Sequence, residues 1–282
     1  MRILTPIAVI SGLLLSGVAG ESQAAPLNYV DTYWGGDDGS LNRDVIGSIS
    51  QFEIFSLDVE RVLNNLVVTI NTNYSGANVG ALGTKVGALF IGDPAKLNYN
   101  GSSVGTGAAP TYNNDVFTND KDRFSYAFDF DLANPGTPGI QNGTGALYQL
   151  SGTGSDVLLS QNLTPSGDFR RDQAVDIRQT VTADQLRAGK TAAVDTGLNG
   201  SWAIGANSVS FSITNFFGGS LPGLYSTSLT LAWAITCAND VILTTAIFPG
   251  QGPSEVPLPA GLTLLLSGLL GLGFLARGKK VV

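Results

Sequence analysis

The sequence predicts an all-β domain, built as an antiparallel two-sheet β-sandwich of the jelly-roll type. Glycine contributes 36 of the 282 residues and only 13% of the residues are charged, a balance that disfavours surface helices and favours turn-rich sheets. Polar and apolar residues alternate over many short segments, which indicates strands with one buried face. Turn signals separate roughly ten to thirteen such segments without an internal repeat, so a sandwich is favoured over a propeller or a solenoid.

The first residues have the layout of a secretory signal peptide. Arg2 precedes an apolar stretch over residues 3–18, and the small residues Ser22 and Ala24 end the segment, as signal peptidase requires. We therefore expect residues 1–24 to be removed during export. Residues 25–249 then form the β-domain, and residues 250–260 form a linker that leads into the tail.

Apolar segments in the first half of the domain predict four strands. Two of them, over residues 51–59 and 66–71, are expected to form a hairpin with a reversal at Leu63-Asn64-Asn65. Further strands are expected over residues 44–48 and 86–91.

The clearest alternation in the chain lies between two polar segments. Residues 95–122 and 132–145 are rich in Asn, Gly and Thr and are expected to be surface loops. Between them, in residues 124–130, Phe and Tyr alternate with smaller or polar residues. We interpret this pattern as the core face of a half-buried strand. The alternative is an exposed aromatic platform on which sugars stack.

The second half predicts seven more strands and one short helix. The helix begins at Thr182-Ala183-Asp184-Gln185, which has the form of an N-terminal cap, and ends before Gly189. The strands are expected over residues 146–150, 156–159, 169–178, 202–204, 209–213, 229–235 and 241–248.

Composition excludes several classes of function. The chain has no His and a single Cys, Cys237, so an intrachain disulfide, a zinc site of the Cys/His type and Ser-His-Asp or Cys-His catalysis are all excluded. We expect Cys237 to fill a core position. The net charge is −7, and removing both termini takes away more basic than acidic residues. Nucleic acid is therefore not expected as a partner.

A cluster of oxygen-bearing side chains near the start of the domain could bind Ca²⁺, the one cofactor that the sequence indicates. Its members are Asp31, Asp37, Asp38, Asn42 and Asp44. Secreted β-domains use such residues to stiffen loops. The alternative is that they are solvated turn residues.

Asp129 and Asp131 form a second candidate pair. Strand geometry places alternate residues on one face about 7 Å apart, a separation compatible with the two carboxylates of a glycosidase. The alternative is that both simply lie on the polar face of an ordinary strand.

The C-terminal tail has three parts. A proline-containing motif is followed by an uncharged apolar run over residues 261–276, long enough for a helix of roughly 24 Å, near the lower limit for crossing a bilayer. Basic residues then end the run and are expected on the cytoplasmic side, within residues 277–282. The motif consists of Val256, Pro257, Leu258, Pro259 and Ala260, and the basic residues are Arg277, Lys279 and Lys280.

This order of parts resembles the PEP-CTERM class of bacterial sorting signals, in its VPLPA variant, although the commoner Pro-Glu-Pro triplet is replaced by Glu255-Val256-Pro257. The resemblance implies an exosortase as processing partner and a Gram-negative cell that makes exopolysaccharide. It also implies a precursor anchored in the inner membrane and a product at the cell surface or outside the cell. The alternative is a plain anchor that is never cut.

Short pieces of the middle are similar to a group of exosortase-dependent surface proteins of unassigned activity. They include Tyr33-Trp34-Gly35-Gly36, residues 67–73 and residues 233–240. More loosely, the hairpin followed by a strand that ends in Gly-Asp looks like DOMON and family-9 carbohydrate-binding domains.

The sequence thus predicts a non-enzymatic protein of the cell surface or extracellular matrix, with a structural or interaction role. The first alternative is a carbohydrate-binding module for exopolysaccharide. The second is a glycosidase that uses paired carboxylates.

Overall fold

The structure is a computed structural model of the chain. It describes residues 25–31, 45, 47–96, 124–130, 138–139, 141–163, 173–219, 221–222, 224 and 227–248. In these ranges no helix has both the length and the apolar character needed to cross a bilayer. The predicted signal peptide, sorting motif, membrane helix and basic end lie outside them.

Ten of the described strands form one continuous sheet in which every neighbouring pair is antiparallel. In spatial order these strands are β1 (Leu27–Val30), β2 (Ile54–Val62), β3 (Asn65–Thr72), β10 (Ser208–Ile213), β9 (Val194–Ile204), β6 (Gln141–Gln149), β5 (Phe124–Phe130), β4 (Leu89–Gly92), β11 (Ser228–Ala234) and β12 (Val241–Ile247). A separate two-stranded sheet pairs β7 (Val157–Leu159) with β8 (Ala174–Ile177). The short helices are α1 (Ile49–Phe52), η1 (Gly76–Asn78), η2 (Ala81–Gly83), η3 (Pro94–Lys96), α2 (Ser160–Leu163) and α3 (Ala183–Arg187).

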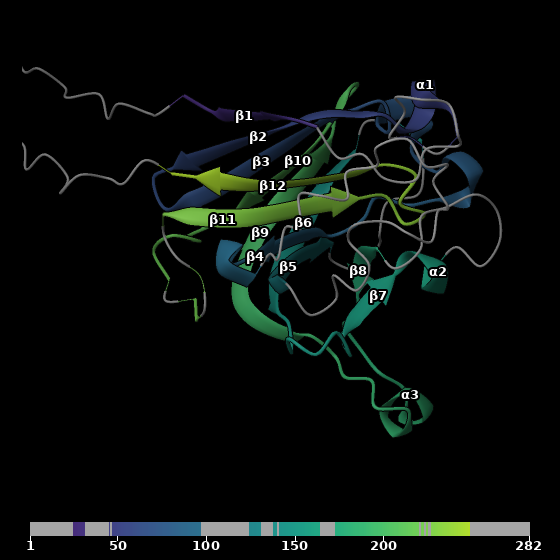
Figure 1. The fold of residues 1–282 in the computed structure, drawn as a ribbon, viewed down its shortest axis with the longest axis vertical. Helices are drawn as coiled ribbons and strands as arrows, with labels where there is room; N and C mark the ends of the chain where they lie inside the picture. The colour runs from purple at the N-terminus through teal and green to yellow at the C-terminus, as the bar shows by residue number, and fades with distance from the viewer. Residues whose placement is uncertain are drawn as a thin grey trace, which may run out of the picture.

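The large sheet curls until its two edges approach each other (Figure 1). At this seam the backbone N–H of Ile247 in β12 donates a hydrogen bond to the hydroxyl of Tyr29 in β1, at 3.1 Å. The all-β antiparallel prediction is confirmed, but the two-sheet sandwich is not found, because ten of the described strands belong to one continuous sheet. Alternation reports only that one face is buried. The alternation pattern is the same whether the buried face packs against a second sheet or against the opposite part of the same curled sheet.

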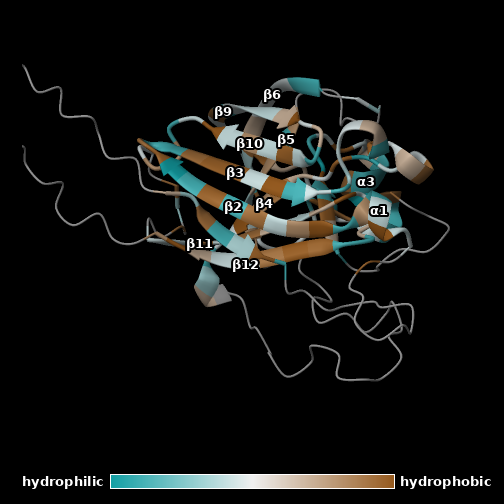
Figure 2. Ribbon diagram, turned by 90° about the horizontal axis from the view of Figure 1, so that it is seen from above, coloured by the Kyte–Doolittle hydropathy of each residue, from teal (hydrophilic) through white to brown (hydrophobic). Residues whose placement is uncertain are grey.

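The main core lies inside the curl. Alternate residues of β3 are fully buried, and Figure 2 shows hydrophobic and hydrophilic residues alternating along β2 and β3. Aromatic rings fill the centre of this core. The ring centroids of Phe128 and Phe211 lie 5.9 Å apart and those of Phe130 and Trp202 lie 5.1 Å apart, and both pairs meet edge to face. Burying each such side chain contributes about 1.5–3 kcal/mol, and each aromatic contact about 0.5–1.5 kcal/mol more.

A second, smaller core lies on the outer face of the sheet, beneath β7 and β8. Phe90 and Ala127 pack there against Val157 and Ile177, and the ring of Phe124 lies 5.2 Å from that of Phe90. β5 is therefore buried on both faces. The prediction that its aromatic residues line a core is confirmed, whereas the prediction that the strand is half-buried was wrong.

Several other elements match the sequence analysis, and some differ. The hairpin is confirmed as β2 and β3, which reverse at Leu63 and Asn64. However, residues 49–52 form α1, and the described residues 47–48 are not in a strand. Residues 141–145, expected in a loop, form the first half of β6, and β9 begins well before the predicted residue 202.

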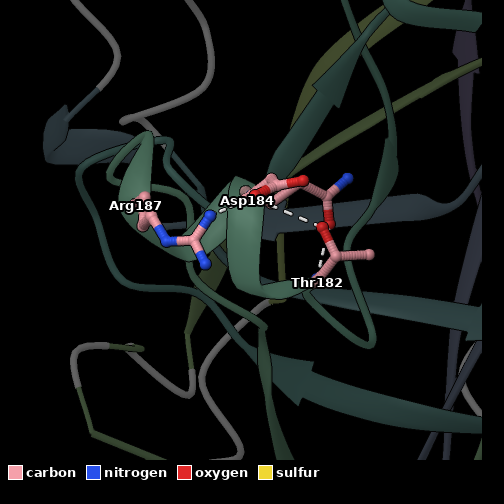
Figure 3. Close-up of polar contacts among 4 residues, drawn as sticks. Thr182, Asp184 and Arg187 are labelled. Atoms are coloured by element: carbon pink, nitrogen blue, oxygen red, sulfur yellow. Dashed lines mark hydrogen bonds and ion pairs between the residues drawn. The ribbon is translucent and has the colours of Figure 1, made fainter.

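The predicted short helix is confirmed as α3. Its cap is reciprocal: Gln185 N donates to Thr182 Oγ1 at 3.3 Å, and Thr182 N donates to Gln185 Oε1 at 2.9 Å (Figure 3). Asp184 and Arg187 form an exposed ion pair one turn apart. Gly189, with φ of +71°, takes the left-handed conformation after the helix.

The two ends of the described domain lie together. β1 begins and β12 ends at the left of Figure 1, whereas β7, β8 and α2 lie at the right. Segments that leave the domain from these strands therefore start at one end of the sheet, and the small sheet lies at the other.

Candidate functional site

A cleft of about 670 Å³ lies where β7, β8 and α2 cover the end of β5. Part of its wall is apolar, formed by Leu158, Leu163 and Ile177 together with Phe130. Its polar lining consists of Asp129, Asn162, Asp176, Arg178, Gln179, Thr180 and Gln185. A concave site with an apolar wall and several convergent polar groups is the usual form of a small-ligand site.

Asp129 is the most deeply placed polar residue of the cleft. The alternation of β5 directs its side chain away from the central core and toward β8, and it is only 5% exposed. Its Oδ1 accepts a hydrogen bond from Phe130 N at 2.8 Å, and its Oδ2 accepts one from Gln179 Nε2 at 2.9 Å. The same Gln179 amide nitrogen donates to Phe130 O at 3.1 Å. Gln179 thus fixes both the carboxyl group and the end of the strand.

Asp176 brings a second carboxyl group to Asp129. It lies in β8, its Oδ1 accepts from Ile177 N at 2.8 Å, and its side chain is hydrogen-bonded to that of Asp129. Burial, and then the negative charge of Asp176, raise the pKa of Asp129 well above its usual range, against the opposing hydrogen bonds from Phe130 N and Gln179. Two carboxyl groups in direct contact cannot both ionise easily, so Asp129 binds its proton more tightly than an isolated carboxyl group does.

Arg178 adds a positive charge to the same wall, and its main chain is firmly held. Its N donates to Asp156 O at 2.7 Å, and its O accepts from Ala193 N at 2.8 Å. The Asp156 carboxylate is fully buried and accepts hydrogen bonds from Ser151 N at 2.5 Å and Ser151 Oγ at 2.9 Å. The Nε atom of Arg178 is buried and makes no hydrogen bond. This nitrogen has almost no solvent-accessible surface, so it is enclosed in the wall and is not open to the cleft.

The candidate pair proposed from the sequence, Asp129 and Asp131, remains a prediction. Asp131 lies outside the described residues, and Asp129 is not on an exposed polar face but is paired with Asp176 from another strand. Directly hydrogen-bonded carboxyl groups are closer than the roughly 5–5.5 Å of a retaining glycosidase. Asp176 and Gln179 were not found from the sequence, because nothing in their local pattern shows that β8 packs against β5.

The calcium prediction remains a prediction. Asp37, Asp38 and Asp44 lie outside the described residues. Asp31 extends the pairing of β1, with its N donating to Phe55 O at 3.0 Å. Within the ranges that the structure describes, no group of three or more Asp, Glu or Cys side chains is placed to hold a metal.

The segment 233–240, part of the resemblance to surface proteins, holds the fold together. Trp233 Nε1 donates to Gly87 O at 3.1 Å, and the fully buried Asp240 accepts from Ile54 N at 2.6 Å. The prediction that Cys237 is a core residue is confirmed, since it is 2% exposed, and burial raises the pKa of its thiol to about 12. These residues stabilise the domain and do not form an accessible site.

Comparison with protein-family models, with curated proteins and with solved structures gave no match.

Proposed function

We propose that this protein is exported, sorted by an exosortase and displayed at the cell surface or in the extracellular matrix, where it has a non-enzymatic, structural or interaction role. The observation that carries the proposal is the tail, in which the VPLPA motif at residues 256–260 is followed by an apolar run and basic residues. The signal-peptide layout of residues 1–24 supports it, because a protein must be exported before its tail can be processed outside.

The chemistry of the motif suits proteolysis. Pro257 and Pro259 prevent helix formation upstream of the apolar run, so the motif stays extended where a membrane-bound protease can reach it. Proteases bind their substrates as extended strands, so a motif whose prolines disfavour helix suits their active sites. The basic residues Arg277, Lys279 and Lys280 orient the apolar run with the domain on the outer side.

The arrangement of the domain is compatible with attachment through its C-terminal end. β12 ends beside β1, at the end of the sheet opposite to the small sheet β7–β8 (Figure 1). A domain held through the segment after β12 would present the cleft away from the point of attachment.

The test is the mass of the protein extracted from the surface of host cells with and without the exosortase. We expect the segment 261–282 to be lost only when the exosortase is present. The double variant Pro257→Ala, Pro259→Ala should be processed slowly, whereas Pro253→Ala, a proline of the linker outside the motif, should be processed normally. Retention of the tail in both cell types would show that the protein is permanently anchored, and would refute the proposal.

A further inference from the structure

We propose that the cleft beside Asp129 binds a neutral carbohydrate. This inference identifies a partner for the displayed domain of the proposed function, but it depends on a different set of residues. The cleft volume of about 670 Å³ falls within the range of roughly 300–1,000 Å³ typical of small-ligand sites and is large enough for a short oligosaccharide.

The polar groups of the cleft match the hydroxyl groups of a sugar. Asp129, Asp176, Gln179 and Asn162 place carboxyl and amide groups in the lining. Beside their internal hydrogen bonds, such groups have capacity for further ones, as binding of sugar hydroxyls requires. Arg178 lies in the same lining, and its guanidinium group offers further hydrogen-bond donors.

The balance of charge favours an uncharged ligand. The lining holds the carboxyl groups of Asp129 and Asp176 and the guanidinium group of Arg178, and burial raises the pKa of Asp129, which favours its uncharged form. No excess of positive charge is present in the described lining to attract an acidic polysaccharide, and the whole chain has a net charge of −7, which repels one.

The site is also built firmly enough to bind selectively. Gln179 holds Asp129 and Phe130 through one amide nitrogen, and both main-chain hydrogen bonds of Arg178 are made. Polar groups that are already fixed lose little conformational freedom on binding, so their hydrogen bonds contribute more to affinity. The apolar side chains of Leu158 and Leu163 can contact the non-polar face of a sugar ring.

The test uses the full-length chain, purified in a mild detergent, on an array that carries neutral glucans, mannans and galactans beside acidic alginate and hyaluronan. We expect binding to neutral glycans, and titration calorimetry with the best of them should then measure affinity for three variants. Gln179→Ala removes the residue that holds Asp129, and Thr180→Lys places a long side chain at an exposed position of the lining. Asn64→Ala, a matched loss of an amide at the β2–β3 turn, serves as the control.

We expect at least a tenfold loss of affinity in Gln179→Ala and in Thr180→Lys, and none in Asn64→Ala. Gln179→Ala also removes internal hydrogen bonds and could destabilise the domain. If it melts at a much lower temperature than the wild type, the affinity of Thr180→Lys alone tests the proposal. Binding to acidic glycans alone, binding that a folded Thr180→Lys variant retains in full, or no binding on the array would each overturn the proposal. None of these results affects the test of tail processing, so the two proposals can fail separately.

Discussion

The raised pKa of Asp129 predicts an unusual dependence of stability on pH, which Asp129→Asn should remove. In the folded protein the pKa of Asp129 is raised, first by burial and then by Asp176, so the folded state binds the proton of Asp129 more tightly than the unfolded state does. The contribution to stability is therefore complete below the unfolded pKa of about 4. It is lost as the pH rises from there through the raised pKa of the folded state.

The size of the effect follows from this linkage. Each unit by which the folded pKa exceeds the unfolded one costs about 1.4 kcal/mol at neutral pH. The asparagine variant cannot ionise, so it escapes this cost, although it loses about one hydrogen bond to Gln179, worth roughly 1 kcal/mol. The loss of this hydrogen bond costs the same at every pH. Between pH 4 and pH 7 the free energy of unfolding of the variant should therefore rise relative to that of the wild type, by at least about 1 kcal/mol.

The assay is thermal unfolding of both proteins at several pH values in this range. For a domain of this size, about 1 kcal/mol corresponds to roughly 2–4 °C in Tm. Asp184→Asn removes an exposed carboxylate of the same charge together with its exposed ion pair to Arg187, and it reports the effect of losing a surface carboxylate. If the melting temperatures of Asp129→Asn and wild type stay parallel from pH 4 to pH 7, Asp129 does not hold its proton as the structure indicates.

Three further substitutions test the fold. Gly200→Ala would place a Cβ atom 2.1 Å from the carbonyl oxygen of Ser212, and chemical denaturation should show a loss of roughly 1–3 kcal/mol, so an unchanged midpoint would contradict this packing. Trp233→Phe leaves the carbonyl of Gly87 without its indole donor, at an expected cost of about 1–3 kcal/mol by the same measurement. Thr182→Ala removes the cap of α3, which weakens the helix by about 1 kcal/mol. Because α3 buries no residue, hydrogen exchange within it should quicken while the Tm of the domain stays constant.

The sequence could predict those parts of the fold that depend on local pattern. The β2–β3 hairpin, the capped helix α3 and the burial of Cys237 each follow from a few neighbouring residues. The number of sheets could not be predicted in this way. Alternation shows that a face is buried, but what buries it depends on contacts between distant segments, such as that between Asp240 and Ile54, which are 186 residues apart.

The candidate site shows the same limit more sharply. Asp129 stands out in the sequence because it is the charged residue among the positions that alternate with the aromatic ones, but its obvious partner by spacing is Asp131. The structure instead supplies Asp176 and Gln179 from a short strand and the segment that follows it, 47 and 50 residues later. β8 lies within the strand predicted over residues 169–178, but alternation does not identify what a strand packs against. β8 is placed by pairing with β7 and by packing on the outer face of the large sheet.

Glycine explains both an error of prediction and the shape of the sheet. Residues 132–145 were expected to be a loop partly because of their glycine content, yet Gly145 lies within β6 and pairs with Gly200 of β9. A Cβ atom at either position would lie within 3 Å of the Phe128 ring, and Trp202 likewise covers Gly143, where a Cβ atom would be 2.7 Å from the indole. Large rings lying over strand glycines let a sheet bend sharply without leaving a void. Glycine in the sequence therefore predicts turns. In the folded domain, the strand glycines instead allow one sheet to curl around its own aromatic core.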